Sequence, residues 1–228
     1  YSATVSLMKR LLYRRGESLC FSDMAVFSNL PDDEYKRALK SLTRVRAVVM
    51  KLRIAPESDV NALVGYWGKR ETTDRIRPLL ESLAKCPTGA TLDVVHLLPA
   101  FARNRLYSFP DRTDTEACAR QNCFWTAFNF FSERTDDRFS DPKYTKEALH
   151  RDYSRSSSEP AFGDLVALQN PQGTYLHWSV FIADNIVFTK NGGYILQPWT
   201  LMKIPDMLAQ YSSEEPLKLV VFRSKNHP

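Results

Sequence analysis

A cysteine, a histidine and an asparagine in the second half of the sequence have the types and the order that acyl-transfer chemistry needs. Cys123 starts a predicted helix, and His177 opens a predicted strand. Asn191 lies in the turn after the following strand. A thiolate can attack a carbonyl carbon, an imidazole can take and return the proton, and a polar side chain can hold the imidazole in one tautomer. These three residues are therefore the candidate catalytic residues, although each also has an ordinary structural interpretation.

The position of the cysteine favours a reactive thiol. Asn122 is a good helix cap, so Cys123 is expected at a helix N-terminus, where the pKa of a thiol falls. The third catalytic position has alternatives. Asn191 is favoured because its side chain offers a carbonyl acceptor, whereas Lys190 offers only donors. Gln197 would serve if the turn NGG folds the chain back once more.

The elements that must position these residues are a helix and a group of strands. The run CFWTAFNFF predicts the helix, and turn signals NPQG, ADN and NGG separate the strands. The predicted strands are DLVALQ, HWSVFIA, NIVFTK and LKLVVFR, and IPDMLAQY is a further helical segment. The expected fold class is α+β, with the nucleophile helix packed on a small antiparallel sheet in a papain-like arrangement.

The first half of the chain reads as mainly helical. We expect an accessory domain over 1–110 and the catalytic domain over 111–228. The segment AVVMKLRIA predicts a strand, whereas DRIRPLLESLAKCP, with Pro78 in its first turn, and TLDVVHLLPAFARNRLYSFP are expected to be helical. A helix pair followed by a basic strand suggests a winged-helix module at 1–55. Its candidate recognition helix carries Lys36, Arg37, Lys40, Arg44 and Arg46.

The charge of the chain is unevenly distributed. Residues 1–110 hold 18 Lys and Arg against 11 Asp and Glu, and residues 111–228 hold 13 against 15, which gives a net charge of +5. A basic first half suggests a polyanionic partner such as nucleic acid, an anionic wall polymer or a lipid surface. The alternative is a solvated basic face. The charge pattern therefore leaves a polyanion-binding role open beside the chemistry of the second half.

Several classes of protein do not fit the sequence. No apolar run is long enough to predict a membrane span. The four cysteines include no CxxC pair and do not cluster with the histidines, so no metal site is expected. The proposed chemistry needs no organic cofactor either. A disulfide between Cys20 and Cys86 is an option if the protein is exported. The chain begins at Tyr1 rather than Met, which allows a removed export signal.

The segments NCFWTAFNFF and FGDLVALQNPQGTYLHWSVFIADNIVFTKNGG resemble the NlpC-like, papain-fold family of cysteine peptidases and amidases. The resemblance covers roughly residues 115–225. In that family a cysteine begins a helix, a Gly-Asp-Leu-Val strand follows, and the base histidine opens the next strand. The resemblance implies that Cys123 is the nucleophile and His177 the base, with Asn191 the favoured third residue.

The same resemblance implies hydrolysis of amide bonds, often in cell-wall peptides, through an acyl-enzyme. The backbone N–H of Cys123 and another donor at the helix start would hold the oxyanion. Asn122, Trp125 and Trp178 flank the nucleophile and the base, and they are the predicted substrate-binding residues. Wall chemistry favours export or the cell envelope over the cytoplasm. The alternatives are a non-catalytic peptide- or polyanion-binding module on the same fold, and a DNA-associated protein that uses the basic first half.

Overall fold

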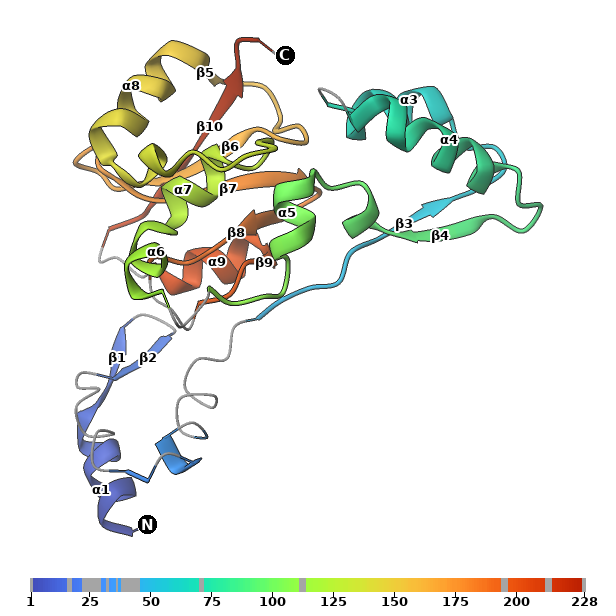
Figure 1. Cartoon of the computed structure of the whole chain (residues 1–228). Coiled ribbons are helices and arrows are strands. Elements are labelled where there is room, and N and C mark those ends of the chain that lie inside the picture. Colours follow the sequence, from blue (N-terminus) through green and yellow to red (C-terminus); the bar gives the residue numbers. More distant parts are fainter. Residues whose placement is uncertain are drawn as a thin grey trace.

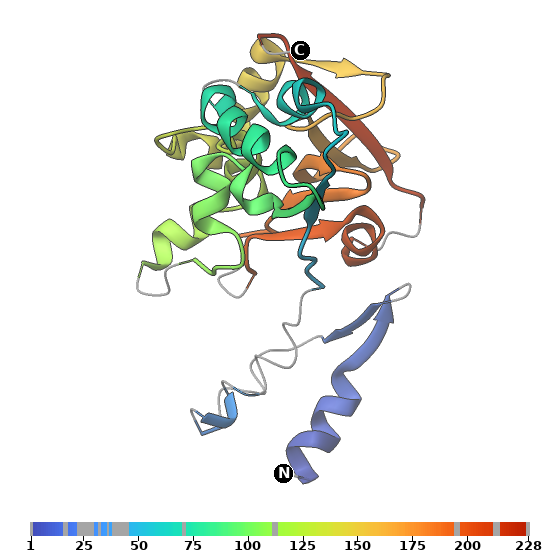
Figure 2. The ribbon, with the colours of Figure 1, turned by 90° about the vertical axis from the view of Figure 1, so that its right-hand side faces the viewer.

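The computed structural model describes most of the chain, namely residues 2–15, 18–21, 30–31, 33–35, 37, 46–69, 72–110, 114–193, 197–211 and 215–226. At the N-terminus, helix α1 (Ser2–Leu11) leads into an antiparallel pair of strands, β1 (Leu12–Arg15) and β2 (Ser18–Phe21). These elements lie apart from the main body in both ribbon views (Figures 1 and 2). Most of the predicted recognition helix, including Lys36, lies outside the described residues.

A six-stranded antiparallel sheet forms the centre of the main body. Its order is β5-β10-β6-β7-β8-β9, so β6 to β9 form a meander and β10 returns between β5 and β6. The sheet confirms the α+β class. The four strands predicted for the second half are present, and two short strands were missed. The bounds are β5 Tyr153–Ser156, β6 Leu165–Gln169, β7 Tyr175–Ala183, β8 Ile186–Thr189, β9 Thr200–Lys203 and β10 Lys218–Ser224.

Helices cover both faces of this sheet (Figures 1 and 2). On one face lie α6 (Thr115–Arg120), α7 (Cys123–Phe128) and α8 (Pro142–Asp152), preceded by the 3-10 turn η3 (Asp137–Ser140). On the other face lies α9 (Ile204–Gln210), over a second apolar cluster. The central strands therefore need apolar side chains on both faces, which explains the nearly continuous apolar run of β6.

The pleat of β7 divides its side chains between the two faces. Trp178, Val180 and Ile182 belong to the large core on the α7 side. Phe181 belongs to the cluster beneath α9, and His177 pairs in register with Leu168, which lies in that same cluster. Because alternate side chains of a strand point to opposite faces, His177 lies on the α9 side of the sheet.

The first half of the chain adds an arm to the body (Figure 1). Two short strands, β3 and β4, pair antiparallel. Helices α3 and α4 lie between these strands in the sequence, and the two helices pack against one another. The prediction that 91–110 is helical from its start is wrong, because its first three residues belong to β4. Pro78 lies inside α4 rather than in its first turn. The bounds are β3 Lys51–Ile54, α3 Val60–Trp67, α4 Thr72–Ala84, β4 Ala90–Asp93, η2 Val94–His96 and α5 Ala100–Arg105.

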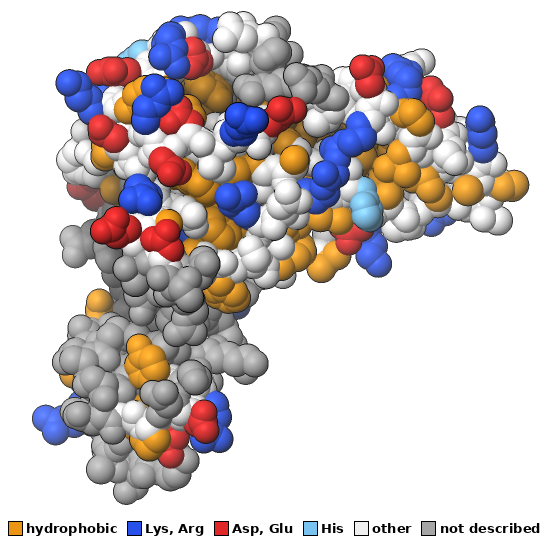
Figure 3. All heavy atoms as spheres, in the orientation of Figure 1, with side chains coloured by type: hydrophobic (Ala, Val, Ile, Leu, Met, Phe, Trp, Pro, Cys, Tyr) orange, Lys and Arg blue, Asp and Glu red, His pale blue; other side chains and the backbone are white. Residues whose placement is uncertain are grey.

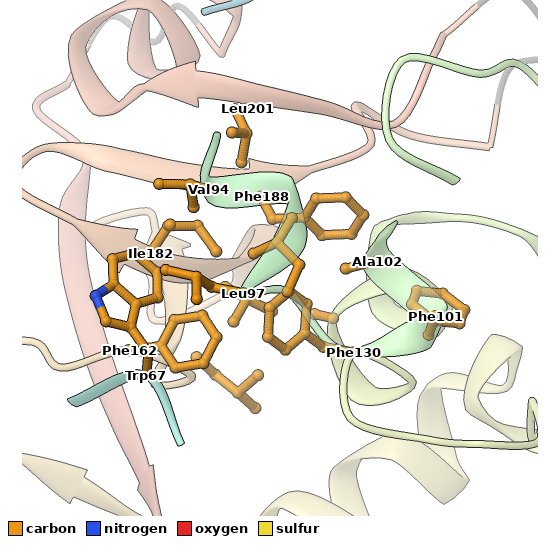
Figure 4. Packing of buried hydrophobic residues seen from close by; sticks show 14 of the residues in the cluster. Trp67, Val94, Leu97, Phe101, Ala102, Phe130, Phe162, Ile182, Phe188 and Leu201 are labelled. Carbon is orange, nitrogen blue, oxygen red and sulfur yellow. The ribbon is translucent and has the colours of Figure 1, made fainter. Parts of the chain in front are cut away.

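One hydrophobic core joins the two halves of the chain. Trp67 and Leu97, from the first half, are in the same cluster as Phe162 and Phe188, from the second. Figure 4 shows these side chains packed together. The ring centroids of Trp67 and Phe162 are 5.0 Å apart. The line drawn between 1–110 and 111–228 therefore crosses a shared hydrophobic core, to which residues of the arm such as Trp67 contribute.

The Gly-Asp pair before β6 has a clear structural role. Gly163 has φ of 92°, and a Cβ there would lie 2.5 Å from the ring of Phe131. Asp164 is 5% exposed and forms an ion pair with Arg223 of β10 at 2.6 Å. Its second carboxylate contact is the backbone N–H of Ala161 at 2.9 Å. The ion pair between Asp164 and Arg223 therefore holds the start of β6 against the neighbouring strand, β10.

Candidate active site

Cys123 begins α7, as predicted from its cap. The side chain of Asn122 accepts a hydrogen bond from the backbone N–H of Trp125 at 3.0 Å. The thiol is only 6% exposed. Burial raises its pKa, while the backbone N–H groups of Trp178 and Phe124 act in the opposite direction. The expected lowered pKa is therefore wrong for this structure, because α7 has six residues and desolvation outweighs the donors at its start.

The position of His177 differs from the prediction as well. The sequence suggested a strand-initial side chain outside the core, but β7 begins at Tyr175 and the imidazole is fully buried. Burial lowers the pKa of His177 to about 3. The resting imidazole is therefore neutral, and the buried thiol of Cys123 is protonated.

Both ring nitrogens of His177 have hydrogen-bond partners. Nε2 lies 2.7 Å from Oγ1 of Thr189, and Nδ1 lies 2.8 Å from the hydroxyl of Tyr211. The ring of Tyr211 also stacks on the imidazole, with centroids 4.5 Å apart and an angle of 22°. The imidazole is held in position from two elements, β8 and the end of α9.

The partners favour one tautomer. Oγ1 of Thr189 lies 3.5 Å from Oδ1 of Asn191, to which it donates. When the Thr189 hydroxyl donates its proton to Asn191, the same hydroxyl oxygen can accept a hydrogen bond from Nε2–H of His177. Nδ1 of His177 then accepts from the Tyr211 hydroxyl. We assign this tautomer from the hydrogen-bond network. It leaves Nδ1 as the nitrogen whose lone pair can take a proton.

Thr189, and not Asn191, is the direct neighbour of the imidazole. Asn191 reaches His177 only through Thr189, and its own Nδ2 donates to Oε1 of Gln210 in α9. Gln197 has a buried Oε1 with no partner among the residues that the structure describes. Neither amide has a described hydrogen bond to the imidazole.

Lys190 lies on the opposite side of β8 from Thr189. Its side chain is fully buried, its Nζ donates to the carbonyl oxygen of Gly192 at 2.8 Å, and it lies 5.8 Å from the ring centroid of Trp199. Its positive charge lowers the pKa of Cys123 against the larger effect of burial. A buried cation beside the thiol would stabilise negative charge that develops on the sulfur.

Tyr211 connects the thiol and the imidazole electrostatically. Burial raises its pKa, and the charge of Cys123 raises it further. The same phenol bonds Nδ1 of His177. His177, Thr189 and Tyr211 therefore form one hydrogen-bonded group on the α9 side of the sheet, whereas Cys123 begins α7 on the other face and interacts electrostatically with Tyr211 and Lys190.

Sequence reasoning missed Thr189 and Tyr211 for different reasons. Thr189 is a polar residue in the apolar strand NIVFT, and its alternation with Val187 indicates the face that it shares with His177. That signal was available in the sequence. Tyr211 is 34 residues from His177 and reaches it only because α9 packs on the sheet. No local pattern indicates that contact.

The predicted substrate-binding residues are in three different environments. Asn122 caps α7. Trp125 is 1% exposed in the shared core, and its indole N–H donates to Asp137 at 2.9 Å, so a substrate cannot reach it in this structure. Trp178 is also 1% exposed, but its indole N–H has no partner among the described residues. An unpaired buried donor costs about 1–3 kcal/mol.

In the described part of the chain, no group of three or more His, Cys, Asp or Glu residues could hold a metal ion. Cys86 and Cys123 are free thiols, and the side chain of Cys20 lies outside the described residues. Within the same residues no helix is long and apolar enough to cross a membrane.

Comparison with known proteins gives no family assignment: no family model, curated protein or solved structure matches this chain.

Proposed function

We propose that this chain is a cysteine-dependent amide hydrolase in which Cys123 is the nucleophile and His177 the base. The observation that carries the proposal is the hydrogen-bonded imidazole. Its Nε2 lies 2.7 Å from Oγ1 of Thr189, and Nδ1 is the acceptor nitrogen in the tautomer assigned from the hydrogen-bond network. A neutral imidazole with its far nitrogen held is the form that a general base requires. The resemblance of the second half to NlpC-like peptidases supports the same assignment.

The reaction would start from a neutral pair, because burial raises the pKa of Cys123 and lowers the pKa of His177. The thiol proton passes to Nδ1 as the sulfur attacks the amide carbon, and this step requires the Tyr211 hydroxyl to leave Nδ1. Lys190 and the backbone N–H of Cys123 would stabilise the developing negative charge.

The second half of the reaction returns the site to its starting state. The C–N bond breaks as the imidazolium of His177 gives its proton to the leaving nitrogen, and a thioester remains on Cys123. Water then attacks the thioester carbon, the C–S bond breaks, and the proton returns to the thiol. Neither step requires an oxidant, a reductant or a second substrate besides water.

The test is hydrolysis of cell-wall stem peptides and of simple N-acyl peptides, followed by mass spectrometry. The parent chain should release an amine and carry a transient acyl group on Cys123. Cys123→Ala and His177→Gln should lose both, while the control Cys86→Ala should retain them. Cleavage that persists in Cys123→Ala would overturn the proposal, as would the absence of both product and acylated enzyme across the panel.

A binding module without turnover is the alternative that the electrostatics favour. A buried thiol with a raised pKa and an imidazole with a pKa of about 3 make a weak nucleophile and a weak base in the resting structure. Under this alternative, peptides bind with equal affinity to the parent and to Cys123→Ala, and no product forms.

Polyanion binding is a second candidate function, and a basic pocket of about 580 Å³ favours it. Lys69, Arg75, Arg103 and Arg134 line the pocket together with a single acidic residue, Glu133. Burial lowers the pKa of Arg75, and the nearby Arg103 lowers it further, as expected where cations gather. Lys and Arg side chains gather where the arm with α3 and α4 meets the body (Figure 3).

Short polyphosphate and a DNA duplex are suitable probes for this pocket. Arg103→Ala with Arg134→Ala should weaken binding about tenfold and reduce its dependence on salt. Lys85→Ala, an exposed cation of the first half outside the pocket, is the matched control. Equal effects of the pocket variants and the control would indicate general charge attraction and would reject the pocket.

A further inference from the structure

A second pocket, of about 670 Å³, lies on the α7 face of the sheet, between α8 and the strands. Phe124 and Trp178 both line it. These two residues directly follow the candidate nucleophile and the candidate base in the sequence. A molecule in this pocket would therefore contact the same turn of α7 and the same stretch of β7 that carry Cys123 and His177.

The interior of the pocket is aromatic. Besides Phe124 and Trp178 it is lined by Tyr153, Tyr175 and Phe222. The ring centroids of Tyr175 and Trp178 are 5.0 Å apart, and those of Trp178 and Phe222 are 5.4 Å apart. Flat rings in mutual contact offer a surface that suits an apolar group, either aromatic or a branched or linear alkyl chain.

The charged side chains that line the pocket are basic. They are Lys146 of α8 and Arg155 of β5, and His150 of α8 lies in the lining as well. The guanidinium of Arg155 donates to the hydroxyl of Tyr175 at 2.8 Å and lies 5.8 Å from the ring centroid of Phe222. No Asp or Glu is among the residues that line this pocket. An apolar interior beside cations is complementary to a ligand with an apolar body and a negative end.

The unpaired indole of Trp178 is an independent observation at this place. Trp178 is 1% exposed, and its Nε1 has no hydrogen-bond partner among the described residues. Buried indole N–H groups usually have a partner. An acceptor oxygen on a ligand in the pocket would supply one, after a small movement of the neighbouring aromatic rings.

We propose that this pocket binds an apolar group that carries a free carboxylate, with the apolar part among the aromatic rings and the carboxylate near Lys146 and Arg155. Two sources have this chemistry, namely the apolar C-terminal residue of a peptide and a fatty acid. The role of the pocket as a substrate subsite rests on the proposed hydrolase function. The binding itself does not, because none of the groups that make it is the thiol.

The experiment uses the full chain with Cys123→Ala, so that binding is measured without turnover. Isothermal titration calorimetry compares N-acetyl-L-phenylalanine with its carboxamide, and decanoate with decanol. Each carboxylate should bind about tenfold or more tightly than its neutral partner. Tighter binding of the phenylalanine derivative than of decanoate indicates a peptide terminus, and the reverse indicates a fatty acid. Equal binding of carboxylates and neutral partners would overturn the proposal, as would no binding of either carboxylate.

Variants on α8 locate the site. Lys146→Ala should weaken carboxylate binding about fivefold or more and leave binding of the neutral partners unchanged. Lys143→Ala is the matched control, because Lys143 is exposed on the same helix and does not line the pocket. The indole N–H signal of Trp178, assigned by ¹⁵N NMR, should move on addition of ligand. Equal effects of the two lysine variants, or an unmoved indole signal at saturation, would reject the pocket as the site.

These outcomes separate the pocket from the proposed hydrolase. Carboxylate binding without any amide cleavage by the parent chain would support the pocket and reject the hydrolase. Cleavage by the parent chain without carboxylate binding would support the hydrolase and reject the pocket.

Discussion

Lowering the pH from 7 to 5 tests the buried imidazole of His177. Burial lowers its pKa to about 3 in the folded chain, against about 6.5 when the chain is unfolded. Below pH 6.5 the unfolded chain binds a proton that the folded chain does not accept until about pH 3. The stability that the neutral imidazole contributes is therefore present above pH 6.5 and is lost as the pH falls from 6.5 towards 3.

The size of the loss follows from the same two values. One such group changes the free energy of unfolding by at most about 1.4 kcal/mol per pH unit. Between pH 7 and pH 5 the unfolded chain changes from mostly neutral to mostly protonated at this position. The expected loss from His177 is about 2 kcal/mol over that interval.

Urea unfolding of the parent chain and of His177→Gln, at both pH values, measures this loss. Glutamine retains a donor and an acceptor for Thr189 and Tyr211 but does not titrate. Neighbouring arginines lower the pKa of carboxylates such as Asp136 and Asp152, so protonation of these groups in acid lowers the stability of both chains. Their contribution cancels in the comparison. The parent should lose about 2 kcal/mol more than the variant, and equal losses in the two chains would refute the assignment of a buried neutral imidazole.

Three further substitutions or labelling experiments test the site and its support. Thr189→Val should cost about 1–3 kcal/mol in thermal unfolding, because the N–H of His177 loses its buried acceptor, and Thr189→Ser should recover most of it; a loss below about 0.5 kcal/mol in the valine variant would contradict the hydrogen bond. Cys123 should react with iodoacetamide more slowly than Cys86 at pH 7, because its thiol is 6% exposed and burial raises its pKa; mass spectrometry that finds it labelled first would refute this. Arg223→Ala should lower the free energy of unfolding by about 2–3 kcal/mol in urea, because it leaves a buried carboxylate unpaired; an unchanged midpoint would show that the pair is not needed.

Local patterns in the sequence were sufficient for much of the second half of the fold. The cap Asn122 and the strands β6, β7, β8 and β10 could be predicted, since caps and strands depend on residues close in sequence. β4 could not be predicted, because its four residues become a strand only by pairing with β3, which lies about 40 residues earlier. The hydrophobic core shared across residue 110 could not be predicted for a related reason, since apolar patterns do not show which core a residue joins.

The sequence by itself determined which reactive groups are present and where they lie along the chain: a thiol at a helix start, an imidazole in a strand and polar residues after the next strand. The tertiary structure decided that Thr189 and Tyr211 hold the imidazole and that both catalytic candidates are neutral at rest. The physical reason is that a pKa depends on desolvation by everything packed around the group. His177 acquires its stacked partner only when α9, more than 25 residues later in the sequence, covers the other face of the sheet.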